Sequence, residues 1–242
     1  MMAKKKRMSS YALKNTLEDL LRARRLQRDA PPLRGEDRRL LPLPTGIAAV
    51  DGVLHGGFPR GRLSEVHGPA SSGRTGLALG LLAQATRAGT LAAWVDPADA
   101  LDPASVSAAG VDLPRLLWLR GDTRSHPLPA AVAAVGTLVG SGLFDVVVLD
   151  LAGASRHDVG RLPGATWIRL QRMIEETPAA LVLLAGSHVA QGPGGVSLAL
   201  EPGAPLWSGA PGAGRLLRGL RAGARAGRQS LRGVNIELRV LD

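Results

Sequence analysis

The chain has 242 residues and no cysteine, and 30 Lys and Arg residues against 20 Asp and Glu give it a net charge of +10. The lack of cysteine excludes disulfides, thiolate zinc sites and cysteine nucleophiles. The positive charge favours a polyanionic partner, nucleic acid first, although arginine enrichment throughout the chain is a purely compositional alternative. No apolar run reaches the roughly 18 residues of a membrane span, so we expect a cytoplasmic protein without a membrane partner.

Residues 1–42 are predicted to form a basic arm and a charged linker, separate from a core at residues 43–242. A helix is indicated by four leucines at helical spacing, Leu13, Leu17, Leu20 and Leu21. Pro31 and Pro32 end this helix. Its apolar stripe either packs on its own domain or docks on another protein or a second copy of the chain, and the sequence leaves both alternatives open.

The stretch 63–82 organises the core. An alternating apolar run leads into the sequence GPASSGRT and then into a helix-forming run. This is the strand, loop and helix order in which G-x-x-x-x-G-K-[ST] binds phosphate with backbone N–H groups and a helix N-terminus. The candidate nucleotide-binding residues are Gly68, Pro69, Ser71, Ser72, Gly73, Arg74 and Thr75. Arg74 replaces the usual lysine, and its wider planar guanidinium alters the phosphate contacts.

Other apolar runs lack alternation, which indicates buried strands of a parallel sheet covered on both faces. These runs are 91–96, 115–120, 144–150 and 180–185. Helices are expected within 43–54, 97–110, 126–139 and 165–176, whereas 151–164 is predicted to be a loop. Strands at 196–201 and 234–241 are expected to add an antiparallel edge, with 202–214 as an irregular connector.

An arginine-rich segment follows that connector. Its candidate contacts with DNA or an acidic partner are Arg215, Arg218, Arg221, Arg225, Arg228 and Arg232. In a helix, this spacing places all six on one face, but interleaved glycines each cost about 1 kcal/mol of helix stability. A strand followed by a loop, with solvated arginines, is the alternative. The five histidines have no metal-ligand spacing, so the sequence predicts no histidine metal site.

Three blocks resemble the core of the RecA recombinase family: 45–62 leading into the phosphate loop, 94–103, and 144–150. The resemblance runs from about Leu43 to Ser187 and implies an α/β, RecA-like phosphate-loop fold. In that fold a mostly parallel sheet is flanked by helices, with an antiparallel C-terminal edge and an N-terminal helical arm. It also implies a site for ATP with Mg²⁺, in which Thr75 and Asp150 lie on the magnesium side.

The departures from the RecA pattern cluster around the nucleotide. RecA's catalytic glutamate falls on Ala98, whose methyl group cannot activate water, and the neighbouring Asp99 is offset by one residue. The aromatic residue that stacks on adenine falls on Ser105, and the γ-phosphate-sensing glutamine falls near Gly186. Together with Arg74, these losses imply a site that does not hydrolyse ATP, so no catalytic residue is assigned.

A RecA-like core with an altered phosphate loop and an arginine-rich tail resembles the ImuA family of damage-inducible mutagenesis proteins. The resemblance implies a non-catalytic adaptor in SOS-induced translesion synthesis that binds an ImuB-like inactive polymerase. RecA recombinase and single-stranded DNA are further candidate partners. Two alternatives remain: an active DNA-stimulated ATPase in which Asp99 or a partner residue supplies the base, and a division inhibitor, because some ImuA relatives are labelled as resembling SulA.

Overall fold

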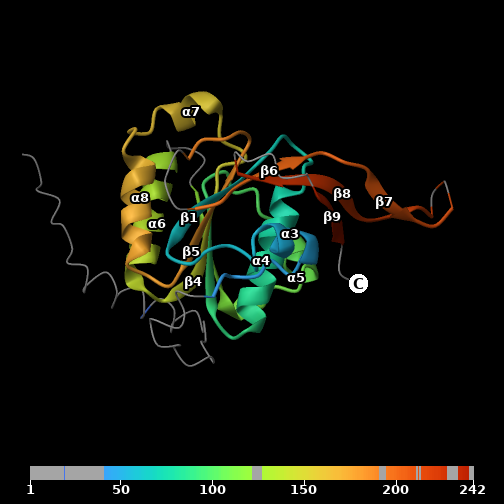
Figure 1. The fold of residues 1–242 in the computed structure, drawn as a ribbon, viewed down its shortest axis with the longest axis horizontal. Helices are drawn as coiled ribbons and strands as arrows, with labels where there is room; N and C mark the ends of the chain where they lie inside the picture. The colour runs from blue at the N-terminus through green and yellow to red at the C-terminus, as the bar shows by residue number, and fades with distance from the viewer. Residues whose placement is uncertain are drawn as a thin grey trace, which may run out of the picture.

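The computed structural model describes residue 19 and residues 41–121, 127–190, 195–210, 212, 214–227 and 234–239. The predicted leucine stripe of Leu13, Leu17, Leu20 and Leu21 lies outside these residues, as do Arg228 and Arg232. Within the described residues the chain forms a nine-stranded sheet between two layers of helices (Figure 1). This architecture confirms the predicted α/β fold.

The sheet has the strand order β3-β2-β4-β5-β1-β6-β8-β7, with β9 paired to β8. The parallel strands are β1 Arg62–His67, β2 Leu91–Asp96, β3 Leu116–Arg120, β4 Phe144–Asp150, β5 Ala180–Ala185 and β6 Ser197–Glu201. The antiparallel additions are β7 Pro205–Ser208, β8 Leu216–Ala226 and β9 Val234–Arg239. The predicted antiparallel edge is therefore confirmed, although β6 joins β1 in parallel.

The helices cover the two faces of the sheet separately, as Figure 1 shows. One face packs against α3 Ala48–Val53, α4 Arg74–Arg87 and α5 Pro103–Ala108. The other face packs against α6 Pro127–Ser141 and α8 Thr166–Glu175. No helix among the described residues is both long and apolar enough to cross a membrane.

Two segments predicted to be irregular contain regular structure. Helix α7 Arg156–Gly160 interrupts the predicted 151–164 loop, because Ser155 caps it by accepting a hydrogen bond from the N–H of Asp158. Strand β7 interrupts the predicted 202–214 connector, where it pairs with β8. Both corrections concern elements of five residues or fewer, which a capping side chain or a partner strand can specify.

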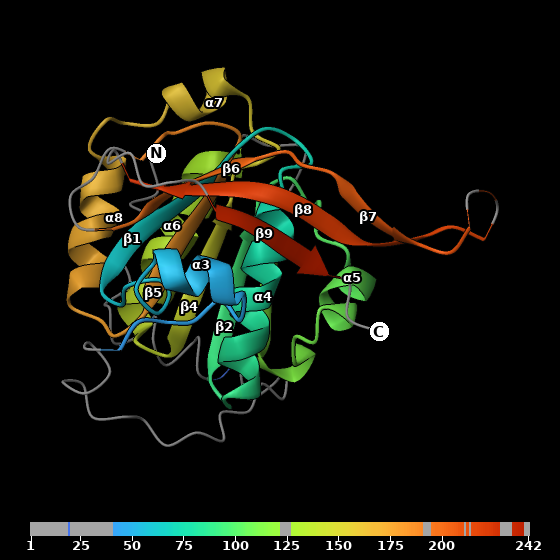
Figure 2. The same ribbon diagram turned by 45° about the vertical axis from the view of Figure 1, so that its right-hand side comes forward.

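The arginine-rich segment is strand β8, so the helical alternative is wrong and the strand alternative is confirmed. Its buried residues alternate along the chain at Ala222, Ala224 and Ala226, while Arg221 and Arg225 are exposed. This period of two fits a strand with one buried face. Beyond the body of the protein, β7 and the adjoining end of β8 project as a hairpin (Figure 2).

Candidate functional site

The predicted phosphate loop joins the carboxyl end of β1 to the N-terminus of α4. The N–H of Gly68 donates to the Ala185 carbonyl at the end of β5, over 3.2 Å. A Cβ at Gly68 would lie 2.3 Å from the Leu200 carbonyl oxygen of β6. At Gly73, where φ is +91°, a Cβ would lie 2.2 Å from Cδ1 of Leu238 on β9. The β6 backbone therefore leaves no room for a side chain at position 68, whereas at position 73 the left-handed backbone conformation favours glycine and Leu238 of β9 packs against it.

Two polar atoms in this loop are buried without a hydrogen-bond partner among the described residues: Ser72 Oγ and Arg74 Nη1. Native proteins rarely leave such groups unsatisfied, and an orphan of this kind calls for a ligand or water. A hydroxyl and a guanidinium both donate to phosphate oxygens, as do the N–H groups at the start of α4. The residues present therefore fit a phosphate group.

Arg74 lies next to Gly186, the position of the γ-phosphate-sensing glutamine in RecA. Gly186 follows β5, and a Cβ there would lie 3.9 Å from Arg74 Nη1, an ordinary van der Waals distance. Burial lowers the pKa of Arg74, and the Asp150 carboxylate opposes this shift. The guanidinium stays cationic at neutral pH. The departures at positions 74 and 186 are thus neighbours in the folded protein.

The predicted magnesium-side pair lies at the loop and at the end of β4. Thr75 is exposed in the first turn of α4, and Asp150 is buried, with its Oδ1 accepting the N–H of Ala152 over 2.9 Å. Burial raises the pKa of Asp150; the Ala152 N–H opposes this shift, Asp96 adds to it, and Arg74 opposes it. A hydroxyl and a carboxylate suit Mg²⁺, so these two residues would hold the ion beside bound phosphates.

The residue at the position of RecA's catalytic glutamate is Ala98, which cannot act as a base. Ala98 is exposed in the turn after β2 and faces the segment after β4, since a Cβ on Gly153 would lie 3.0 Å from the Ala98 methyl. Asp99 accepts two hydrogen bonds from Arg120, over 2.6 and 2.7 Å. Its hydrogen bond with Arg120 lowers the pKa of Asp99. Because Arg120 engages both carboxylate oxygens and lowers their affinity for a proton, Asp99 is a poor substitute base.

Ser105 has a structural role in place of adenine stacking. Its Oγ donates to Asp102 Oδ2 over 2.6 Å, and its N–H donates to the same oxygen over 2.9 Å. Asp102 is the N-cap of α5, so Ser105 completes the helix start.

The described arginines of β8 do not form a single stripe. Arg221 pairs with Glu237 of β9 at 3.1 Å, and Arg225 pairs with Glu201 of β6. All four side chains are at least one-third exposed. These two arginines therefore form surface ion pairs between strands, each worth at most about 1 kcal/mol.

The projecting hairpin holds the other two described arginines. The guanidinium of Arg215 lies 4.8 Å from the ring centre of Trp207, a cation–π contact, and Arg218 Nε donates to Ser208 Oγ over 2.8 Å. Leu216 and Leu217 are more than half exposed beside them. The hairpin thus combines positive charge with exposed apolar surface.

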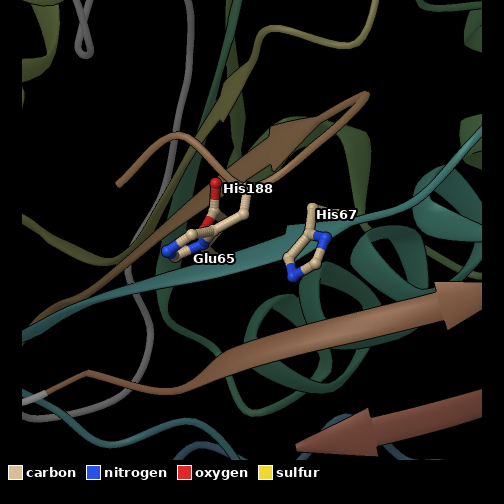
Figure 3. A group of neighbouring side chains, drawn as sticks. All are labelled: Glu65, His67 and His188. Carbon is tan, nitrogen blue, oxygen red and sulfur yellow. The ribbon is translucent and has the colours of Figure 1, made fainter. Parts of the chain in front are cut away.

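One cluster was missed by the sequence analysis. Glu65 and His67 of β1 meet His188, which follows β5, and Figure 3 shows the three side chains together. Burial lowers the pKa of His67, while Glu65 opposes this shift and His188 adds to it. Spacing along the chain gave no indication that these two histidines meet in the fold. The sequence does contain a signal for this cluster: β1 ends in the pattern E-x-H, and a histidine follows β5. Two buried parallel strands of this kind are expected to be neighbours, as they are here.

The parallel sheet, the glycine-constrained loop after β1 and the acid at the end of β4 define a phosphate-loop protein with a RecA-like core. The RecA N-terminal domain family matches residues 34–159, a little over half of the chain. The chain therefore belongs to this family.

Three relatives named Protein RecA illustrate the similarity. The protein of Acidothermus cellulolyticus is 47% identical over 149 residues, which cover 60% of this chain and 42% of the relative. That of Symbiobacterium thermophilum is 46% identical over 113 residues, covering 46% and 31%. That of Enterococcus faecalis is 38% identical over 154 residues, covering 62% and 42%. The matches thus span less than half the length of each relative.

Proposed function

We propose that this chain is a RecA-like adaptor in DNA repair that binds ATP with Mg²⁺ but does not hydrolyse it. The observation that carries this proposal is a phosphate loop with two buried orphan donors, Ser72 Oγ and Arg74 Nη1, beside a glutamate position occupied by Ala98. The donors favour binding of phosphate, whereas the absence of a carboxylate at position 98 removes the water-activating group. The relatives named Protein RecA support a role in DNA repair or recombination.

The magnitude of the catalytic loss is large. Removing a general base typically costs a factor of about 10² to 10⁴ in rate, and losing a preorganised electrostatic contact costs about 10² to 10³. Asp99 does not replace the base, because Arg120 engages both its oxygens and lowers its affinity for a proton. We therefore expect hydrolysis at the background rate, with or without single-stranded DNA.

The test combines a nucleotide titration in Mg²⁺ with a hydrolysis assay on the full chain. Saturable binding without turnover supports the proposal, and the paired change Arg74→Lys with Ala98→Glu should recover some turnover. Asp150→Ala is the control, since it removes the magnesium-side carboxylate. A wild-type rate that DNA stimulates severalfold and Asp150→Ala abolishes would instead establish the alternative, an active DNA-stimulated ATPase.

Within DNA repair, we place the chain in SOS-induced translesion synthesis, as an ImuA-type protein in the cytoplasm. Its proposed partners are an ImuB-like inactive polymerase and RecA recombinase, with the leucine stripe at 13–21 as the docking surface. Deleting residues 1–30 should remove partner or self-association, measured by pull-down and light scattering, and leave the melting temperature unchanged. A sharp fall in melting temperature with association intact would assign the helix to its own core.

A further inference from the structure

The cluster of Glu65, His67 and His188 lies on the sheet beside the phosphate loop, but the nucleotide site does not use it. Residues 65 and 67 lie on the same side of β1, because strand side chains alternate. His67 directly precedes the loop glycine Gly68, and His67 is paired in register with Ala185 of β5. The parallel pairing of β1 with β5 therefore brings His188 to the same edge (Figure 3).

The three side chains offer one carboxylate oxygen and two imidazole nitrogens, all within 4.8 Å of one another. His188 Nδ1 lies 2.5 Å from Glu65 Oε2, and the two imidazole centres are 5.5 Å apart. The hydroxyl of Ser197 lies 3.4 Å from the same Nδ1. A tetrahedral zinc shell needs ligand atoms about 3.3 Å apart, given bond lengths of about 2.0–2.2 Å. Shifts of about 1 Å in the rings would complete such a shell.

Glu65 is fixed in the way that metal-bound carboxylates are. Its side chain is only 2% exposed, and its Oε1 accepts the N–H groups of Val189 and Ala190 over 2.7 and 3.3 Å. These bonds leave Oε2 directed toward His188. Hydrogen bonds of this kind orient a ligand and raise metal affinity.

His188 gives the cluster access to solvent, because its side chain is 46% exposed. Its ring can therefore adjust to an ion at little cost, and a water can take the fourth coordination position. Two imidazoles and a carboxylate suit Zn²⁺ and similar transition metals, whereas Mg²⁺ prefers oxygen ligands alone. The ligand set thus differs from the magnesium-side pair of Thr75 and Asp150.

We propose that Glu65, His67 and His188 form a binding site for Zn²⁺ or a similar divalent transition metal. The ion fastens the segment after β5 to the end of β1, immediately before the phosphate loop. This site is independent of the proposed nucleotide binding, so failure of either proposal leaves the other intact.

The experiment uses the full chain without a histidine tag, stripped of metal with a chelator. Zn²⁺ is titrated by calorimetry in excess Mg²⁺, which occupies oxygen-only sites. One ion should bind per chain, and His188→Ala and His67→Ala should each weaken binding by at least about tenfold. Exposed His157, outside the cluster, supplies the matched control His157→Ala, which should bind like the wild type.

Two further readouts address folding and geometry. Zn²⁺ should raise the melting temperature of the wild type but not that of His188→Ala, a variant expected to fold because the side chain is half exposed. Co²⁺ should give the strong visible absorption of a four-coordinate site. No stoichiometric binding by the wild type, or equal binding by wild type and His188→Ala, would overturn the proposal and leave only a Glu65–His188 hydrogen bond.

Discussion

Replacing Ser72 with alanine tests whether the buried hydroxyl of the phosphate loop serves to bind an anion. The Ser72 hydroxyl is completely buried and has no hydrogen-bond partner among the described residues. An unsatisfied buried polar group costs about 1–3 kcal/mol. Ser72→Ala should therefore raise the free energy of unfolding of the nucleotide-free protein by at least about 1 kcal/mol. For a chain of this length, that change corresponds to about 2–4 °C in melting temperature.

This gain in stability should be cancelled when nucleotide is present. A hydrogen bond to a charged group contributes about 1.5–3 kcal/mol, so losing the hydroxyl should weaken Mg²⁺–ATP binding by at least about tenfold. At 100 times the dissociation constant, a ligand adds about 2.7 kcal/mol to stability, and the variant should lose much of that gain. Thermal melts should show the variant melting above the wild type without nucleotide and losing that advantage in Mg²⁺–ATP.

The matched control is Ser71→Ala. Ser71 is the neighbouring loop serine, but its side chain is exposed and its φ of +59° is equally demanding for alanine. Its stability should change by no more than about 0.5 kcal/mol without ligand. If Ser72→Ala instead destabilised the nucleotide-free protein and left ATP binding unchanged, the reasoning about orphan donors would be refuted.

Two other predictions concern the acid of β4 and the arginines of β8. Burial raises the pKa of Asp150 above its ordinary value of 3.8. In the pH interval between 3.8 and the raised pKa, Asp150 keeps its proton in the folded protein but has lost it in the unfolded chain. Stability therefore falls as pH rises through the interval, and Asp150→Asn should stabilise the nucleotide-free protein at neutral pH but not in acid, as measured by melting curves. For DNA contact, the double change of Arg215 and Arg218 to Ala should flatten the plot of log affinity against log salt by about 1.4. The same change at Arg221 and Arg225 should have a smaller effect, because glutamates already neutralise both; equal effects would contradict this distinction.

The buried strands of the sheet were predictable because unbroken apolar runs specify them directly. The phosphate loop was also predictable, since its glycines and flanking elements are contiguous in sequence. The arginine spacing left a helix and a strand open. The alternation of small residues at Ala222, Ala224 and Ala226 was the signal that distinguished the strand. Strand β7 could not be predicted locally, because its Pro- and Gly-rich segment becomes a strand only by pairing with β8.

The metal-ligand cluster could not be found from spacing. His67 and His188 are separated by most of the core, and they meet only because β5 lies beside β1. Predicting the contact between the two histidines requires the order of the strands in the sheet as well as their positions in the sequence. Similarly, the closeness of Arg74 and Gly186 depends on the approach of two loops at one sheet edge.

The contact between Leu238 and Gly73 has a consequence for how the protein is made. The phosphate loop lies in the first third of the chain, but its packing partner belongs to β9, near the C-terminal end of the described residues. On the ribosome, β1 and α4 emerge long before β9 exists, so the side of the loop that β9 covers stays exposed until β9 has been synthesised. Such distant contacts slow folding and prolong the exposure of apolar surface. We therefore expect ribosome-bound chains truncated before β9 to be unusually sensitive to protease at this loop.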